Sequence, residues 1–203
     1  MKTVYVDNNA TTRVDEKVLE EMLPCYTENY GNPSSMHHKG AESGNVLKLA
    51  RGRVAKILNA EAGEILFTSC GTESNNSAIR AALKLNPDKK HIVTTMVEHP
   101  AVKTLCETLD KEGYRTTYVP VDSKGRLNMQ AFVASLTPDT AIVSVMWANN
   151  ETGTIFPIRE IAEKVKAKGI LFHTDAVQAV GKIPVDAKDI PFDMLSLSGH
   201  KLH

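Results

Sequence analysis

The stretch TAIVSVMWANNETG, residues 140–153, is largely apolar at both odd and even positions as far as Trp147 and then turns polar. A strand that is covered on both faces has this pattern, whereas a strand with one solvent-facing side alternates apolar and polar residues. The segment therefore predicts a buried strand that delivers two asparagines, Asn149 and Asn150, to one edge of a sheet.

Further short β-branched runs alternate with amphipathic segments along the chain. Gly113 and Gly169 are placed as C-terminal stops of helices, and Pro157 as an N-terminal start. This alternation predicts a doubly wound, mostly parallel α/β sheet with helices on both faces and with ligands at the carboxyl ends of the strands. The other expected strands are residues 3–6, 64–69, 91–95, 115–121, 169–175 and 193–198, and the expected helices are 16–30, 42–59, 73–85, 101–113, 128–136 and 157–169.

Composition narrows the class of protein. The chain has 203 residues, 42% of them hydrophobic, so it can bury a large core. Basic and acidic residues number 24 each, which argues against nucleic acid and an anionic membrane as partners. No stretch approaches the ~18 apolar residues of a membrane span, and the start MKTVYVDNN is too polar for a signal peptide. We therefore expect a cytoplasmic protein. The three cysteines, Cys25, Cys70 and Cys106, are an odd number without metal-ligand spacing, so we expect reduced thiols and no metal site.

SCGTES, residues 69–74, is a glycine turn that opens into an expected helix. The first amides of a helix have no intrahelical partner, so this start can bind an anion through its N–H groups, its dipole and the Thr72 hydroxyl. The alternative interpretation is that Thr72 or Ser69 caps the helix.

Asp175 and Gln178 follow the expected strand 169–175. A carboxylate in this place can keep a pyridine nitrogen protonated, which makes pyridoxal phosphate (PLP) an electron sink. Alternatively, Asp175 caps the short turn that follows it. Gln178 either donates to a phenolic oxygen or completes the same turn.

His99 and Lys201 are the candidates for proton transfer and nucleophilic chemistry. His99 precedes Pro100, which favours a helix start, so the imidazole either lies over the ligand crevice or is a polar cap. Lys201 follows a largely apolar run, where burial of an ammonium group is costly and a desolvated amine becomes a nucleophile. The alternative is an exposed lysine on a loop. His173 lies inside an expected strand, where a core role is the simplest interpretation, and no role is assigned to His37, His38, His91 and His203.

Seven motifs resemble, in their order and spacing, those of the cysteine desulfurases of the class V, fold type I PLP family. Their sequences are most similar to the nitrogen-fixation (NifS-type) subgroup. The motifs are DNNATT, GNPSS, FTSCGTES, VEHPAV, WANNETG, HTDAVQAVGK and SLSGHK.

The resemblance implies a role for each matching residue. Lys201 and His99 are the implied catalytic residues, and Asn150 lies between the cofactor's phenolic oxygen and the substrate carboxylate. For cofactor binding it implies Lys201 as the point of attachment, Gly71, Thr72, Ser198 and His200 at the phosphate, His99 stacked on the ring, Asp175 at the pyridine nitrogen, and Gln178 and Asn150 at the phenolic oxygen.

The reaction that the resemblance implies converts L-cysteine to L-alanine in a homodimer. The sulfur passes to an enzyme cysteine as a persulfide and then to an iron–sulfur scaffold protein. The alternatives are another class V PLP enzyme, such as a selenocysteine lyase or a small-molecule aminotransferase, or an inactive PLP-binding fragment.

Family members are about twice as long as this chain, so we expect an N-terminal half. Residues 1–14 would belong with the small domain, and residues 15–203 would form an incomplete PLP-binding large domain. The nucleophilic cysteine and a substrate-binding arginine are expected after His203.

Overall fold

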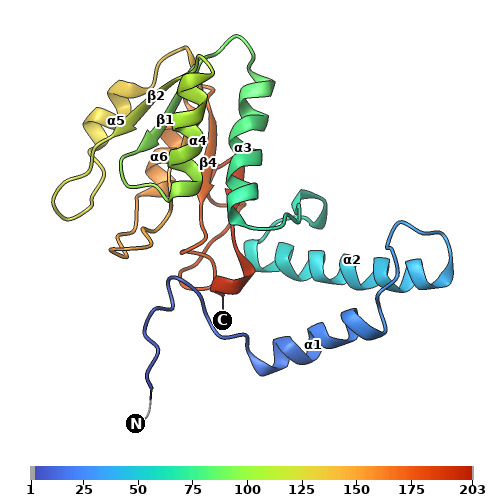
Figure 1. Ribbon diagram of the computed structural model, residues 1–203. Helices are drawn as coiled ribbons and strands as arrows, with labels where there is room; N and C mark the ends of the chain where they lie inside the picture. The colour runs from blue at the N-terminus through green and yellow to red at the C-terminus, as the bar shows by residue number, and fades with distance from the viewer. Residues whose placement is uncertain (1–2, 203) are drawn as a thin grey trace. The chain divides into compact units, whose positions relative to one another are not determined.

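The computed structural model describes residues 3–202 and divides into two compact units (Figure 1). The first unit comprises the described residues up to 67 together with 185–188 and 199–202. The second comprises residues 68–184 and 189–198. His203, to which we assign no role, lies outside the described residues.

The second unit is built on a five-stranded sheet of order β2-β1-β3-β4-β5, and every neighbouring pair is parallel. All residues of β1 and β3 are buried, as strands covered on both faces require. The predicted parallel α/β architecture is confirmed. The strands are β1 His91–Thr95, β2 Arg115–Val119, β3 Thr140–Ser144, β4 Leu171–Asp175 and β5 Met194–Ser196.

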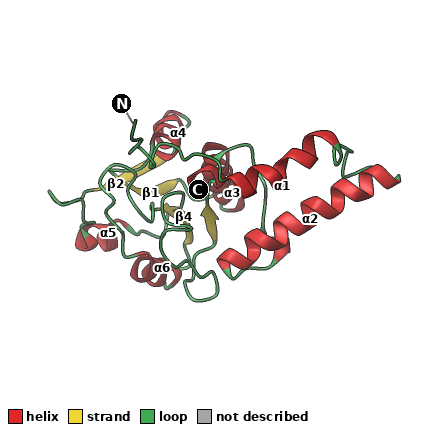
Figure 2. Ribbon diagram, turned by 90° about the horizontal axis from the view of Figure 1, so that it is seen from below, coloured by secondary structure: helices red, strands yellow, loops and turns green. Residues whose placement is uncertain are grey.

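Helices cover both faces of this sheet. Helices α3 (Gly71–Leu85) and α4 (Pro100–Lys111) pack on one face, where Ile79 and Val102 join Ile92 in a buried cluster. Figure 2 shows α5 (Met129–Ser135) and α6 (Ile158–Lys166) on the opposite face. Burial of one such aliphatic side chain contributes about 1.5–3 kcal/mol, so the amphipathic faces of the helices hold the layers together.

The predicted helix boundaries have clear causes in the backbone. Gly113 follows α4 with φ of 93°, and Gly169 follows α6 with φ of 64°. Both angles lie in the left-handed region that ends helices and favours glycine. Pro157 directly precedes the first residue of α6.

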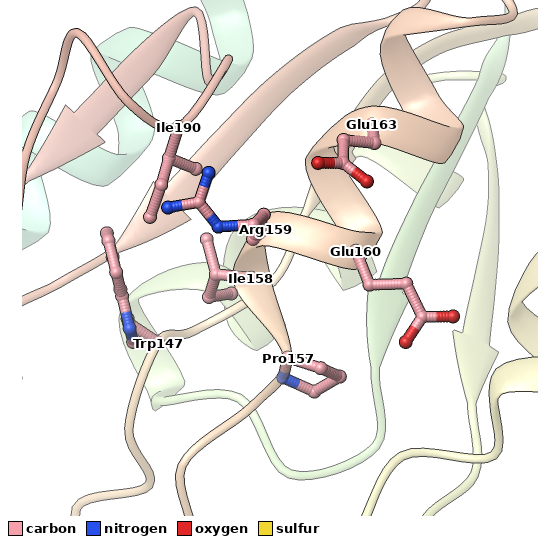
Figure 3. Close-up of a pocket in the computed structure, with 7 residues that line it drawn as sticks. All are labelled: Trp147, Pro157, Ile158, Arg159, Glu160, Glu163 and Ile190. Carbon is pink, nitrogen blue, oxygen red and sulfur yellow. The ribbon is translucent and has the colours of Figure 1, made fainter.

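The second unit also carries an open cavity beside α6 (Figure 3). The guanidinium of Arg159 in its lining is paired with the Asp189 carboxylate. No residue that the sequence predicts for the cofactor lines the cavity, so we assign it no part in the site. The lining residues are Trp147, Pro157, Ile158, Arg159, Glu160, Glu163 and Ile190.

The first unit contains α1 (Glu16–Thr27), α2 (His38–Leu58) and the short 3-10 turns η1 (Ala62–Glu64) and η2 (Gly199–Lys201). A close-packed loop joins α1 to α2. A Cβ atom on Gly31 would lie 2.3 Å from the Lys39 carbonyl oxygen, and one on Gly40 would lie 2.2 Å from that of Ser35. Only glycine fits at these two positions.

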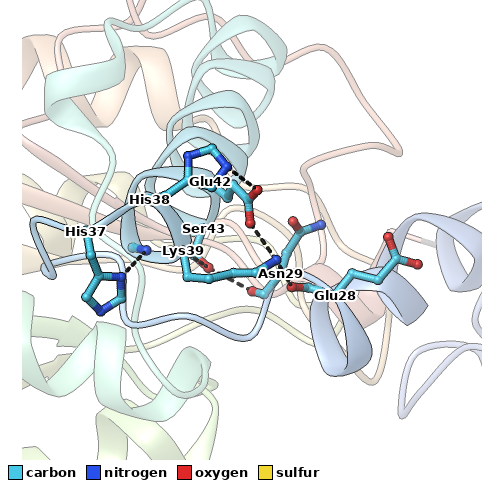
Figure 4. Close-up of polar contacts among 8 residues, drawn as sticks. Glu28, Asn29, His37, His38, Lys39, Glu42 and Ser43 are labelled. Carbon is cyan, nitrogen blue, oxygen red and sulfur yellow. Dashed lines mark hydrogen bonds and ion pairs between the residues drawn. The ribbon is translucent and has the colours of Figure 1, made fainter.

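Side chains close the same loop (Figure 4). His37 Nδ1 accepts a hydrogen bond from the Gly40 amide at 3.3 Å and caps α2. The Glu42 carboxylate pairs with Lys39 at 2.8 Å and with His38 at 3.0 Å. The GNPSS motif is therefore part of a close-packed connection between α1 and α2.

Two predicted strands are wrong. Residues 3–6 are irregular, and 64–69 form the end of η1 followed by irregular chain. Val4 is 74% exposed and Leu66 is 78% exposed. A strand forms when a neighbour satisfies its backbone N–H and C=O groups, and among the described residues neither segment has such a neighbour. The last strand is also shorter than predicted, so Lys201 lies in η2 and not at a strand tip.

Candidate active site

Asp175 ends β4 at the carboxyl edge of the sheet and is only 5% exposed. Its Oδ2 accepts a hydrogen bond from Asn75 Nδ2 at 2.7 Å, and its Oδ1 accepts one from the Val177 amide at 3.0 Å. The second bond is the turn cap that the sequence offered as an alternative. Both donors are neutral N–H groups that stabilise the negative charge of the carboxylate.

Asn75 is a site residue that the sequence reasoning missed. It is 1% exposed, and its Oδ1 is buried with no hydrogen-bond partner among residues 3–202. The signal was present, because Asn75 is a polar residue on the buried face of α3 that also carries Ile79 and Leu83. An amide on the apolar face of an amphipathic helix needs a buried partner, and Asp175 is that partner.

The start of α3 fits an anion. Cys70 occupies the N-cap position with extended backbone and no side-chain capping bond. Because Cys70 is the N-cap, neither Ser69 nor Thr72 is the cap. The Ser69 amide and hydroxyl both donate to Glu73 Oε2 at 2.6 Å. The N–H of Glu73, followed by the Ser69 hydroxyl, lowers the pKa of the exposed Cys70 thiol. N–H groups of this first turn therefore point to where a negative charge can be bound.

Gly71 lies where three segments of the second unit meet. A Cβ atom on it would lie 3.4 Å from Val177 Cγ2 and 3.8 Å from Ser198 Cβ. The helix start, the turn after β4 and the segment after β5 are thus close together. Amide donors and a serine at this point, with a buried carboxylate at the end of β4, have the chemistry that the phosphate and the pyridine nitrogen of PLP need.

His99 is exposed at the N-cap of α4, where its Nδ1 accepts a hydrogen bond from the Ala101 amide at 3.1 Å. The geometry therefore assigns the proton of the neutral ring to Nε2. His99 is therefore a polar cap, which was one of the two alternatives. The bond from the Ala101 amide also fixes the ring in the turn after β1.

Asn149 and Asn150 differ in burial and in their contacts. Asn149 is buried, and its Oδ1 accepts from the amides of Glu151 and Thr152 at 3.0 and 2.9 Å. Asn150 is half-buried and donates to Glu151 Oε1 at 2.7 Å. Asn149 shapes the turn that presents Asn150.

Gln178 lies in the turn after β4 and is 9% exposed. Its Oε1 accepts from Lys182 Nζ at 2.6 Å. In an amide side chain the nitrogen donates and the oxygen accepts, so Gln178 Nε2 is the group of this side chain that can donate to an oxygen.

Lys201 and His200 lie in the first unit, in η2. Lys201 is half-buried, and its Nζ donates to the carbonyl oxygens of Asn9 and Ala10. The His200 carbonyl accepts from Thr12 Oγ1 at 2.7 Å. The DNNATT motif, whose role the sequence left open, therefore holds the lysine segment in place.

His173 is fully buried, which confirms its core position. Burial lowers its pKa to about 3, so the ring is neutral. It belongs to a polar chain that ends at Ser74, in the first turn of α3. The chain runs from Ser144 Oγ to His173 Nδ1 at 2.9 Å, from His173 Nε2 to Ser196 Oγ at 3.0 Å and from there to Ser74 Oγ at 2.8 Å.

Among residues 3–202, no group of three or more His, Cys, Asp or Glu side chains is placed to hold a metal ion. None of the helices described is long and apolar enough to cross a membrane.

Residues 4–203 match the family model described as aminotransferase class-V. The chain belongs to this family. It is 58% identical over 204 residues to the cysteine desulfurase NifS of Azotobacter vinelandii, matching all of this chain and 51% of that protein. It spans about half the length of the curated relatives that it matches.

Solved structures agree with the family assignment. A NifS-like protein, 45% identical, matches with a TM-score of 0.95 over 98% of this chain and 56% of its own. SspA in complex with cysteine, 38% identical, matches with a TM-score of 0.94 over 98% of this chain and 58% of its own. Class-V aminotransferases and NifS-like cysteine desulfurases are PLP-dependent, and the predicted fold type I architecture is confirmed.

Proposed function

We propose that this chain is the cofactor-binding part of a cysteine desulfurase. The enzyme converts L-cysteine to L-alanine and passes the sulfur, as a persulfide on an enzyme cysteine, towards iron–sulfur cluster assembly. The observation that carries the proposal is the buried Asp175 carboxylate, held by Asn75 at the sheet edge, in the unit that also carries the start of α3. The 58% identity to NifS supports cysteine as the substrate.

In this proposal, the residues predicted from the sequence hold PLP. The first amides of α3, with Thr72 and Ser198, bind the phosphate, and His200 contributes from η2. Gly71 lets the backbone approach the phosphate closely. The Asp175 carboxylate accepts a hydrogen bond from the pyridine nitrogen and keeps that nitrogen protonated. When bound, PLP supplies an electron sink for negative charge on the α-carbon of the substrate.

The remaining residues place the substrate and move its protons. The amides of Gln178 and Asn150 donate to the phenolic oxygen, and Asn150 also reaches the substrate carboxylate. His99 stacks on the ring and carries a proton at Nε2, where it can serve as an acid. Lys201 is the point of covalent attachment, and its released amine takes the proton from the α-carbon.

The assembly around this site is also part of the proposal. We infer a cytoplasmic homodimer that acts in nitrogen fixation or general cluster assembly and hands sulfur to an iron–sulfur scaffold protein, so that metal belongs to the pathway and not to this site. Residues 1–14 would belong with a small domain, and residues 15–203 with the PLP-binding large domain.

The test uses the complete gene product. It should bind one PLP per chain and form L-alanine from L-cysteine, with an equal amount of sulfide released when a reductant is present. Release of selenide from selenocysteine without action on cysteine would favour a selenocysteine lyase. Amino transfer to a 2-oxo acid would favour an aminotransferase, and PLP binding without any product would favour an inactive fragment.

A further inference from the structure

Glu98 is a buried acidic residue without a part in the proposed function. It is 6% exposed and lies in the turn after β1, directly before His99. Its Oε1 accepts from Thr95 Oγ1 at 2.8 Å and from the Met146 amide at 3.0 Å. Its Oε2 is buried and has no hydrogen-bond partner among the described residues. One carboxyl group thus joins the end of β1 to the segment that follows β3.

The two segments that Glu98 joins carry His99 and Asn150. A second bond links them, because Asn149 Nδ2 donates to the Val97 carbonyl oxygen at 3.0 Å. His99 is fixed to the same turn through its cap on α4. A shift of the turn after β1 therefore moves the His99 ring relative to Asn150.

The surroundings of Glu98 favour its protonated form. Among residues 3–202, no lysine, arginine or histidine forms an ion pair with it. Burial raises the pKa of Glu98 to about 8, the negative charge of Asp175 acts in the same direction, and the bonds from Met146 and Thr95 oppose the rise. The thiol of Cys106 on α4 also interacts electrostatically with Glu98. Burial, followed by Glu98, raises the Cys106 pKa to about 12, so the thiol is neutral.

We propose that Glu98 is a positioning residue which, as a neutral carboxylic acid, ties the turn after β1 to the end of β3 and so places His99 and Asn150 for the reaction. The inference rests on the proposed function, because it takes His99 and Asn150 to contact the cofactor. A protonated Glu98 also adds no second buried negative charge near Asp175. The charge of Asp175 itself must be matched by the protonated pyridine nitrogen.

Two substitutions in the complete gene product separate a neutral tie from a charged group. In Glu98→Gln, the amide oxygen still accepts from Thr95 and Met146, and an N–H replaces the acid O–H. We expect its kcat to stay within about 3-fold of the wild-type value. The visible circular dichroism band of bound PLP should not shift. Glu98→Ala leaves both donors without an acceptor, and we expect an altered dichroism band and a kcat about 100-fold lower.

Glu107→Ala, an exposed change on α4, is the matched control and should leave both readouts unchanged. If Glu98→Gln were as impaired as Glu98→Ala, the negative charge would be the active feature and the inference would be wrong. Unchanged dichroism and kcat in Glu98→Ala would also overturn it.

The pH dependence of unfolding gives a readout that does not involve turnover. Folding raises the pKa of Glu98 from 4.5 to about 8, so its stabilisation is fully present below pH 4.5 and is lost as the pH rises to about 8. The urea midpoint of the wild type, measured against Glu98→Gln with and without added PLP, should fall over this range and then level off. A constant difference would contradict a neutral Glu98. A wild type that binds no PLP would overturn the proposed function, and this series would still decide whether Glu98 is the neutral tie.

Discussion

Apolar residues are buried in the second unit, which contains the sheet, but are largely exposed in the first unit, which contains α1 and α2. In the second unit, all residues of β1 and β3 are buried between two layers of helices. In the first unit, α1 has no buried residue, and the apolar residues Val4 and Leu66 are exposed. The difference shows that β-branched composition alone does not make a strand, because each strand also needs a neighbour for its backbone groups.

The residues proposed for PLP chemistry are also divided between the two units. Substitution of Lys201 should have the largest effect on turnover. The phosphate and pyridine contacts proposed for Asp175 and α3 lie in the second unit, whereas Lys201 lies in the first. Lys201→Ala should lower turnover by at least about 1,000-fold while PLP still binds through its phosphate. Alanine production measures turnover, and absorbance and equilibrium dialysis measure the bound PLP.

Borohydride reduction provides the control for that prediction. In the wild type it should fix the pyridoxyl group on Lys201, as peptide mapping would show. Lys188→Ala, an exposed lysine of the same unit, should change neither labelling nor turnover. A label on any other lysine would contradict the assignment of Lys201.

Asp175→Ala tests the contribution of the second unit alone. PLP should remain bound through the start of α3, but turnover should fall by about two to three orders of magnitude, because the protonated pyridine nitrogen loses its partner. Steady-state alanine production measures the loss. Near-normal production would rule out the proposed role of Asp175.

Paired core and surface substitutions test the packing difference. Ile79→Ala removes a side chain that is 0% exposed and should cost about 2–5 kcal/mol of unfolding free energy. Leu66→Ala removes one that is 78% exposed and should change it by less than about 0.5 kcal/mol. Urea unfolding of the complete gene product measures both. A loss at Leu66 as large as that at Ile79 would show that the helical unit is covered in the whole protein, and the comparison would fail.

Asn75→Ala should have a smaller effect on activity. It removes one of the hydrogen bonds to Asp175 but leaves the carboxylate in place, so we expect kcat to fall about 10-fold with little change in KM. Ser77→Ala, an exposed change on the same helix, is the control. An equal effect of the two substitutions would deny Asn75 any role in positioning Asp175.

How much the sequence predicted depends on the range of each interaction. The apolar run at residues 140–147 predicted β3, the β-branched run at 91–95 predicted β1, and glycines predicted the ends of α4 and α6, since these signals are local. The contact of Asn75 with Asp175 and the bonds of Glu98 join residues about 100 and 48 positions apart, and spacing along the chain does not reveal such pairs. For the same reason the motif DNNATT was found, while its contacts with Lys201 were not.

The three cysteines should have the smallest effect on turnover. Cys106 is buried, and burial raises its pKa to about 12, so it does not supply a thiolate. Cys25 is exposed on α1 but belongs to a helix, which does not swing.

Cys70 is the serious candidate, because it is exposed and the N–H of Glu73 lowers its pKa. It sits, however, at the start of α3, where the phosphate is proposed to bind, away from the carbon that carries the substrate. A nucleophile that collects sulfur and hands it on needs a mobile segment. The replacement of Cys25, Cys70 and Cys106 by serine in the complete gene product should therefore keep most of the desulfurase activity, measured as alanine and sulfide, whereas residues 1–203 alone should release no sulfide. If Cys70→Ser by itself abolished persulfide formation while PLP stayed bound, the sulfur acceptor would be Cys70 and the start of α3 would bind sulfur as well as phosphate.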